Sequence, residues 1–437
     1  MKTSKFQIIT LAIFVVAIIA GAASFALYKG SSGSATLPDV SIWGTFPADI
    51  FNKYVSNINN TLASPLKVNY IQYKLEDFSK NFVNALALGQ GPDAVLIPSE
   101  MLLSEFNKLI HVPYTVLPKD TFFNSYIDEA RIYLSDNGVQ AIPFSVDPIV
   151  MYWNRDNFNS AGIATYPKYW DEFTGSSLKP GLAQKLTSKD QNGNIRKSAI
   201  AMGDFSNITN AREVMGSLLL QSGNPVTMIG NGGVVSTIST SYSASPIPAF
   251  RFFSQFADPS NANYSWNKGM VNDKSAFLSG VLSTYFSFAS ELSSIKAKNP
   301  NLNFDVAPIP QLRTGGQKSG YAKMYGFSLV RASTKLDAVF QVISTLTTAN
   351  NLKDLSQTMY LPSVRRDVIA IGSTDPYITI FNQAVLVSKT WIDVDASKSG
   401  QIFSNLVQAV TSGQKNIDQA VRDAGDQYNV VLKQAGQ

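Results

Sequence analysis

Residues 140–173, QAIPFSVDPIVMYWNRDNFNSAGIATYPKYWDEF, decide the fold of this chain. Proline fixes its own φ and biases the residue before it away from helix, so Ile142-Pro143 predicts extended backbone. Residues 149–153 form an apolar run of strand length, and residues 156–161 predict a short helix that stops at Gly162. The end of the stretch predicts the start of another helix. Taken alone, these features describe a strand between two short helices in any α/β protein.

The order of these pieces is more specific than any one of them. Four motifs follow one another: Ile142-Pro143, then Trp153-Asn154-Arg155-Asp156, then Gly162-Ile163, and finally Pro167 followed by Trp170, Glu172 and Phe173. This order resembles the crossover of the extracellular solute-binding proteins of ABC importers, in the maltose-binding-protein-like carbohydrate family 1. In that family an Ile-Pro pair ends the first lobe, and a strand then crosses a hinge and ends in Tyr-Asn-Lys-Asp. Two departures are visible, because Trp153 replaces the tyrosine and Tyr169 is inserted before Trp170.

Further segments carry the same resemblance. Gly89-Gln90-Gly91-Pro92-Asp93 stands between a predicted helix at residues 77–88 and a predicted strand at 94–97, which is a signature of the family, and Asp93 is expected to be structural. The other segments are residues 277–292, residues 304–310 as a return crossover, residues 361–367, and C-terminal helical patterns at 402–432 divided by Gly413. The resemblance implies an α/β, two-lobed periplasmic-binding-protein type II fold that closes on its ligand by hinge motion.

The length of 437 residues is too great for one compact core, so two lobes are expected. The chain passages of the family assign residues 39–146 and 314–358 to the first lobe. They assign residues 147–313 and 359–437 to the second lobe. The fold is expected to be preceded by a signal or transmembrane anchor at residues 1–30 and a flexible linker at residues 31–38.

The N-terminus favours a membrane anchor over a cleaved signal peptide. Lys2 and Lys5 precede an apolar stretch at residues 6–28, which is about the length that a spanning helix needs. A signal peptide has a shorter apolar core of about 7 to 15 residues, although Ala20-Gly21-Ala22 offers a cleavage site. The lysines predict an N-terminus inside the cell and a chain that crosses the cell membrane once, with its bulk extracellular or periplasmic.

Composition excludes several classes of protein. Apolar residues make up 45% and charged residues 15%, which is a globular composition, and the net charge of +5 comes without a basic run that predicts nucleic-acid binding. With no cysteine, the chain has neither a disulfide, a thiolate zinc site nor a lipid-modified cysteine. Asp190, Asn192 and Asn194 alternate as in a calcium loop, but Asn192-Gly193 is the better signal for a hairpin. No metal site and no cofactor are expected.

Catalytic motifs are missing as well. His111 is the only histidine, and neither a Gly-x-Ser-x-Gly elbow nor a phosphate-binding loop accompanies it, so the chain is not expected to be an enzyme. A pair of carboxylates for glycoside hydrolysis is a matter of three-dimensional separation, which leaves a membrane-anchored glycan hydrolase as an alternative. A binding protein for another small solute is a further alternative.

The resemblance implies a ligand site that both lobes supply, and no catalytic residue. Positions carried over from the first lobe are Gly44, Thr45 and Phe46 after the first strand, and Ser99 and Glu100 after the third. Asp147 occupies the crossover position of a ligand-contacting glutamate, although capping of the turn at Pro148 explains it equally well. Positions carried over from the second lobe are Asp204, Phe205, Phe288, Ser290, Trp391, Asp393 and Phe403. Aromatic rings suit the C–H faces of sugars, and carboxylates and amides suit their hydroxyls.

These expectations combine into one function. The resemblance implies a monomeric, extracellular, membrane-anchored component of an ABC transporter that binds a carbohydrate, expected to be an oligosaccharide, between its two lobes and delivers it to a permease. Its expected partners are the sugar, the permease and the membrane, and no nucleic acid.

Overall fold

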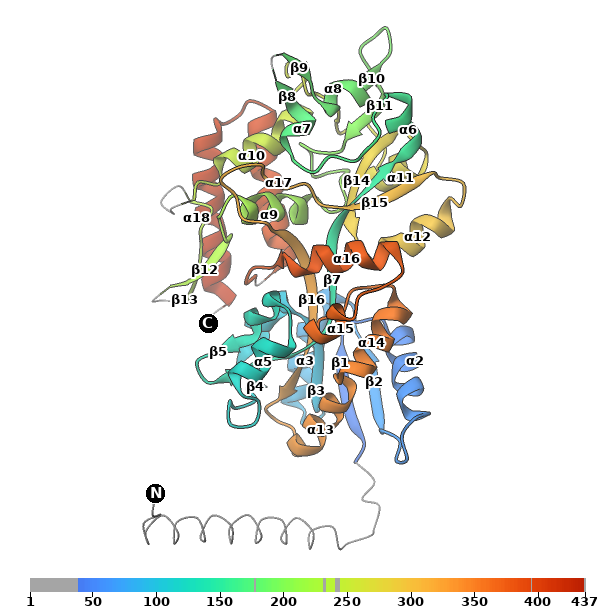
Figure 1. Ribbon diagram of the computed structural model, residues 1–437. Coiled ribbons are helices and arrows are strands. Elements are labelled where there is room, and N and C mark those ends of the chain that lie inside the picture. Colours follow the sequence, from blue (N-terminus) through green and yellow to red (C-terminus); the bar gives the residue numbers. More distant parts are fainter. Residues whose placement is uncertain (1–37, 177, 231–232, 240–243, 394, 436–437) are drawn as a thin grey trace, which may run out of the picture.

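The computed structural model describes residues 38–435 apart from 177, 231–232, 240–243 and 394, and it shows two lobes, one above the other in Figure 1. The predicted anchor and most of the predicted linker lie outside the described residues. Within the described part of the chain, no helix combines the length and the apolar character needed to cross a membrane. The α/β architecture with two lobes agrees with the fold expected from the sequence.

The first lobe, below in Figure 1, opens with a parallel βαβ arrangement. Strand β1 (Val40–Gly44) pairs in parallel with β2 (Val68–Gln72) on one side and β3 (Ala94–Pro98) on the other. The strand predicted at 94–97 is confirmed and ends one residue later. The connecting helices bury one apolar stripe each, and the second of them confirms the helix predicted at 77–88 with ends that differ by up to two residues. The elements before the hinge are completed by α2 (Ala48–Asn59), α3 (Leu75–Ala87), α4 (Leu102–Glu105), β4 (Leu109–Ile110), α5 (Lys119–Ser125), β5 (Leu134–Ser135) and β6 (Gly138–Val139).

Asp93 has the structural role that was predicted for it. Its carboxylate accepts hydrogen bonds from the backbone N–H of Ser41 (3.0 Å) and the hydroxyl of Ser333 (2.7 Å), and Lys335 lies 3.6 Å away. It therefore ties the start of β1 to the segment that follows β16 (Gly320–Val330).

Two long strands join the lobes. The first half of β7 (Ile142–Asn154) pairs with β16, and its second half pairs with β14 (Leu282–Phe288) and β15 (Phe304–Pro308). The sequence predicted a strand only at 149–153, because Pro148 was taken as its boundary. In the structure Pro148 is paired in register with Ala322, and a bulge opposite Tyr325 and Gly326 lies beside Pro143, which is one of the places where a sheet admits proline. The return to the first lobe runs through β16, whereas β15 stays within the second lobe.

The second lobe is built around the sheet β10-β11-β14-β7, with helices on both sides. The predicted hairpin at Asn192-Gly193 is confirmed, since β10 (Ser188–Lys189) and β11 (Ile195–Ile200) are antiparallel and Gly193 has φ +82°. Its remaining elements up to β15 are α6 (Arg155–Ser160), α7 (Asp171–Thr174), β8 (Gly175–Ser176), β9 (Lys179–Pro180), α8 (Leu182–Leu186), α9 (Ala211–Gln221), β12 (Thr227–Gly230), β13 (Gly233–Ser236), α10 (Ile247–Ser254), α11 (Asp273–Leu278) and α12 (Glu291–Lys298).

The last part of the chain contributes to both lobes. After β16 come α13 (Leu336–Leu346), α14 (Ala349–Met359), α15 (Arg366–Ala370), α16 (Pro376–Leu386), β17 (Ser388–Lys389), α17 (Ala396–Thr411) and α18 (Ile417–Ala435). The predicted division of the tail is confirmed, because Gly413 has φ +71° between α17 and α18. In Figure 1, α16 lies across the junction of the two lobes.

Two separate clusters of buried hydrophobic side chains define the lobes. Val364 and Ile369 belong to the cluster of the first lobe, and Tyr321 belongs to that of the second. The lobe boundaries given above stay a prediction. These three residues show that segments after residue 320 contribute buried side chains to both cores.

Candidate functional site

The two hinge strands place opposite charges side by side. Asp147 on β7 and Lys323 on β16 are paired in register, directly across from one another. Both side chains are partly buried. The antiparallel ladder therefore fixes a carboxylate and an ammonium group at the place where the chain passes between the lobes.

The surroundings of Asp147 perturb its titration. The backbone N–H of Ser290 donates a hydrogen bond to its Oδ1 at 3.1 Å. Burial raises the pKa of Asp147 to about 6, although the hydrogen bonds from Ser290 and the charge of Lys323 oppose the rise. Asp147 therefore does more than cap a turn, because it links β7 to the residue that precedes α12.

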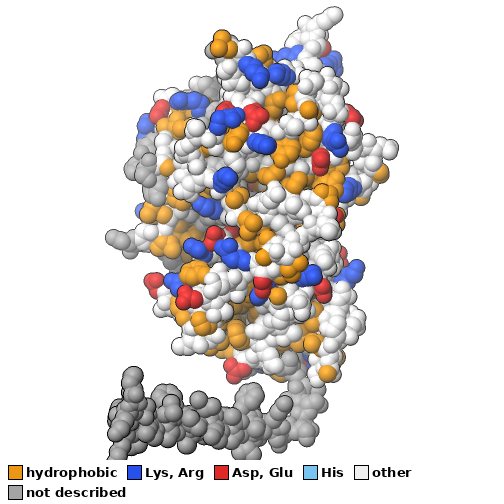
Figure 2. Space-filling view, in the orientation of Figure 1, with side chains coloured by type: hydrophobic (Ala, Val, Ile, Leu, Met, Phe, Trp, Pro, Cys, Tyr) orange, Lys and Arg blue, Asp and Glu red, His pale blue; other side chains and the backbone are white. Residues whose placement is uncertain are grey.

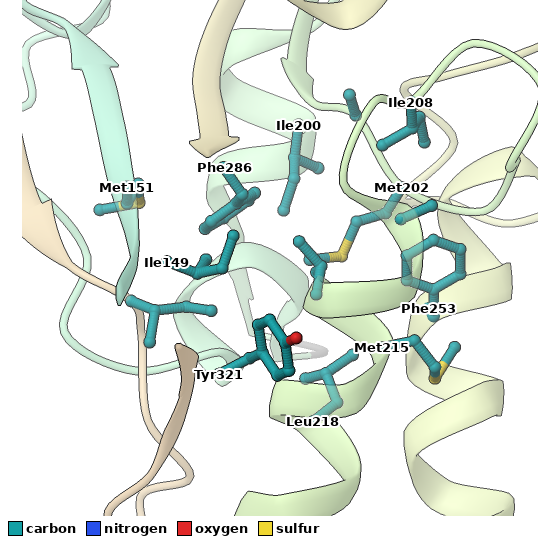
Figure 3. Packing of buried hydrophobic residues seen from close by; sticks show 14 of the residues in the cluster. Ile149, Met151, Ile200, Met202, Ile208, Met215, Leu218, Phe253, Phe286 and Tyr321 are labelled. Carbon is teal, nitrogen blue, oxygen red and sulfur yellow. The ribbon is translucent and has the colours of Figure 1, made fainter. Parts of the chain in front are cut away.

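Glu100 and Tyr321 connect the two lobes directly. Glu100 lies in a 3₁₀ turn just after β3, and the hydroxyl of Tyr321 donates to its Oε2 at 3.1 Å. The ring of Tyr321 packs in the second lobe near Trp391 and Phe288, with centroids 5.0 and 6.3 Å away. Figure 3 shows this ring beside Leu218 of α9. A first-lobe carboxylate thus meets the edge of the second-lobe core.

Arg212 of α9 organises the buried side of the junction. Its guanidinium donates to Asp393 (2.5 Å), Glu213 (2.9 Å) and the hydroxyl of Ser399 (2.9 Å), and it stacks 4.6 Å from the ring centroid of Trp391. Burial alone would lower the pKa of Arg212, but the neighbouring carboxylates raise it instead. The same contact lowers the pKa of Asp393 against the effect of burial. Asp393 and Trp391 are thus engaged in an internal network and are almost fully buried.

The loop after β1 comes to the hinge from the first lobe. A Cβ at Gly44 would lie 2.3 Å from the carbonyl oxygen of Leu96, so this position admits only glycine. Thr45 follows, partly exposed, with a buried hydroxyl that has no hydrogen-bond partner among the described residues. Phe46 is buried, with its ring centroid 5.3 Å from that of Tyr325 on β16.

The remaining positions predicted from the second lobe differ in the solvent exposure of their side chains. Asp204 and Phe205 are partly exposed in the loop after β11, where Asp204 accepts hydrogen bonds from Ser206. Phe288 is partly exposed at the end of β14, and Ser290 is exposed. Phe403, by contrast, is fully buried between Phe250 of α10 and Tyr428 of α18. Ser99 is buried beside Glu100 in the first lobe.

The structure adds residues that sequence reasoning missed. Tyr321, Lys323 and Tyr325 alternate along β16, so they share one face of the strand. Lys323 lies 5.4 Å from the ring centroid of Tyr325. The available signal was the Tyr-x-Lys-x-Tyr alternation within residues 321–325, which puts two hydrogen-bonding rings and a cation on one side of the chain once these residues are read as a strand.

Two surface hollows are lined by residues other than the hinge residues Glu100, Asp147, Tyr321, Lys323 and Tyr325. One of about 270 Å³ is lined by residues of α14, α15 and α16, including Lys353, Tyr360 and Asn382. Another of about 430 Å³ is lined in part by Asp171, Lys185 and Arg313. In the described ranges, no three His, Cys, Asp or Glu side chains come together in a way that could hold a metal ion. On the face drawn in Figure 2, acidic and basic side chains are interspersed.

Comparison with known proteins identifies relatives of this architecture. The family model described as bacterial extracellular solute-binding protein matches residues 49–379. A solved cyclo/maltodextrin-binding protein in complex with maltotetraose has a TM-score of 0.72 at 14% identity, and the alignment covers 93% of this chain and 100% of that one. A cyclic α-maltosyl-1,6-maltose binding protein from Arthrobacter globiformis has 0.72 at 16%, covering 91% and 99%. The sugar-binding protein MalE from Xanthomonas citri has 0.72 at 17%, covering 91% and 98%.

At such low identities the solved structures establish the likeness of the fold alone. A search of curated protein sequences gave no match.

Proposed function

The chain belongs to the bacterial extracellular solute-binding proteins, and we propose that it is the substrate-binding component of an ABC importer, taking a carbohydrate where its lobes meet. The family consists of binding proteins, which are extracellular or periplasmic and are not enzymes. A glycan hydrolase is therefore set aside in favour of binding and release.

The observation that carries the proposal is the mixed cluster on the hinge strands. Asp147, Glu100 and Lys323 offer hydrogen-bond acceptors and donors next to the partly exposed rings of Tyr325 and Phe288. Hydroxyl pairs of a sugar suit such donors and acceptors, and its C–H faces suit the rings. The solved relatives described above are sugar-binding proteins, which agrees with this ligand class.

The proposed ligand site divides the predicted residues by role. Partly exposed side chains are proposed to contact the ligand, namely Thr45, Asp147, Asp204, Phe205, Phe288 and Ser290, together with Lys323 and Tyr325. Buried residues are proposed to shape that surface from behind, namely Gly44, Phe46, Ser99, Glu100, Trp391, Asp393 and Phe403. Glu100 becomes a contact where lobe movement frees it from Tyr321.

Calorimetric titration of the soluble part of the chain with mono- and oligosaccharides tests the ligand class. We expect 1:1 binding of at least one sugar without turnover, and an at least tenfold weaker affinity after Phe288→Ala. Binding of peptides or polyamines with no sugar bound would contradict the proposal. Release of reducing ends from a bound glycan would support the hydrolase instead.

The anchor, the permease and the monomeric state complete the proposal. Membrane fractionation of cells that produce the full chain, compared with a chain lacking residues 1–30, tests a single-pass anchor: the full chain is expected with the membrane and the shortened one in the soluble fraction. Cross-linking in the presence of sugar is expected to capture a membrane permease, and light scattering is expected to give a monomer.

A further inference from the structure

Six ionisable side chains form one electrostatic cluster at the hinge. The carboxylates are those of Glu100, Asp147, Glu213 and Asp393, and the cations are Lys323 and Arg212. Tyr321 connects the two cations, since its hydroxyl donates to Glu100 at 3.1 Å and the Arg212 guanidinium lies 5.9 Å from its ring centroid. Lys323 follows two residues later on the same face of β16, and Asp147 is directly across from it on β7. With all six groups ionised, carboxylates outnumber cations by two to one.

Arg212 has little capacity left for a charged ligand. Three of its nitrogens donate to Asp393, Glu213 and Ser399, and its flat face lies against Trp391. The side chain is nearly fully buried. A carboxylate from outside would have to displace a contact that is already made.

Lys323 is the cation that a ligand would meet first. Among the described residues no carboxylate lies within salt-bridge distance of its Nζ, but Asp147 is paired with Lys323 across the two strands and the Tyr325 ring centroid lies 5.4 Å from Nζ. Burial lowers the pKa of Lys323, whereas Tyr325, Glu100 and Asp147 raise it and outweigh burial. Beside its contact with Tyr325, the ammonium group has N–H donors for neutral acceptors such as hydroxyl oxygens.

We propose that this cluster selects uncharged saccharides and rejects saccharides that carry carboxylates, with Lys323 acting as an internal counter-charge and hydroxyl donor. The inference rests on the proposed carbohydrate function and narrows its substrate class. A uronate placed near Lys323 also approaches Glu100 and Asp147, and like charges in a partly buried site repel strongly. One unbalanced charge at contact distance corresponds to about tenfold or more in affinity.

Matched pairs of sugars test the proposal. The probes are trisaccharides of glucose, galactose and mannose and the corresponding trisaccharides of glucuronate, galacturonate and mannuronate, titrated at pH 7.5 and low salt. For each neutral trisaccharide that binds, we expect the affinity of the corresponding uronate trisaccharide to be weaker by about tenfold or more. The difference is expected to shrink as salt is added, because ions screen the repulsion.

Variants assign the selectivity to the cluster. Asp147→Asn is expected to reduce the ratio of the neutral sugar's affinity to the uronate's affinity by about tenfold. Asp258→Asn is the matched control, because within the described part of the chain the Asp258 carboxylate accepts hydrogen bonds from Ser260 alone, in an exposed turn, and this variant is expected to leave the affinities unchanged. Lys323→Met is expected to weaken the neutral sugar and to leave the uronate rejected. Melting curves identify any variant that has lost its fold, and Glu100→Gln then replaces Asp147→Asn as the test.

The outcomes separate the two hypotheses. A uronate bound as tightly as its neutral partner overturns the selectivity and leaves the carbohydrate function standing. No binding of any neutral or acidic saccharide overturns the carbohydrate function, and the selectivity falls with it.

Discussion

The hydroxyl of Tyr321 lies 3.1 Å from Oε2 of Glu100, and this hydrogen bond joins the core of the second lobe to the end of the third strand of the first. Both residues are buried. Because the bond spans the two lobes, it contributes to the relative free energy of their arrangement as well as to folding. The predictions that follow begin with this contact.

Tyr321→Phe removes the donor and leaves a buried carboxylate less well satisfied. We expect a loss of about 1–3 kcal/mol in the free energy of unfolding, measured by chemical denaturation. Tyr114→Phe is the control, because its hydroxyl bonds Ser135 within the first lobe and is half-exposed. Equal losses in the two variants would contradict a special role for the inter-lobe bond.

Gly216→Ala tests the packing of Trp391 on α9. An added Cβ would lie 2.4 Å from the indole ring, so the ring or the helix has to move, at a cost of about 1–3 kcal/mol. Gly400→Ala is a matched control in another helix, where the added Cβ meets Arg212 at an ordinary 3.6 Å. We expect that variant to be neutral or stabilised, because alanine favours helix. If both variants melt at the same temperature, α9 and Trp391 accommodate the added Cβ at position 216 without strain.

Glu129 makes stability depend on pH. Burial raises its pKa from 4.5 to about 8, against the hydrogen bond from Ser388, so the folded state holds a proton that the unfolded state releases. The sign follows from linkage: this contribution is fully present below pH 4.5 and is lost as pH rises to about 8. The melting temperature is expected to fall between pH 6 and 8, and Glu129→Gln is expected to flatten that fall. An unchanged slope in the variant would rule out Glu129 as its source.

Arg212→Met leaves Asp393 buried beside Glu213 without its cation. Breaking a buried ion pair on one side costs about 3–5 kcal/mol, which denaturation measures as a lower free energy of unfolding. Adding Asp393→Leu to this variant is expected to recover part of the loss, because the uncompensated charge is removed as well. A double variant that loses the full sum of the two single effects would show that the pair is not coupled.

The elements that the sequence predicted well are those set by neighbouring residues. The strand β3, which follows the Gly-x-Gly-Pro-Asp segment, and the helices on either side of Gly413 follow from glycines that end helices and from apolar stripes. The length of β7 was underestimated, because Pro148 was taken as the boundary of the apolar run. Only pairing with the distant strand β16 shows that Pro148 stays in register opposite Ala322 and that a bulge lies beside Pro143.

The site was harder to predict, because its residues meet through long-range pairing. Asp147 and Lys323 become neighbours through strand register, and Arg212 reaches Asp393 across 181 positions of sequence. No local pattern encodes either contact. The family resemblance supplied Asp147 and Glu100, and it offered no position for Lys323, whose partners were visible only after β16 was placed.

The way in which the two cores draw on distant parts of the chain has a consequence for biogenesis. The first-lobe core unites Val40 with Val364 and Ile369, and the second-lobe core unites Ile149 with Tyr428. A polypeptide emerging from the ribosome therefore cannot finish either core until nearly all of it has been made. For a chain that is translocated across a membrane before it folds, the late completion of both cores leaves the early part without a finished core during translocation.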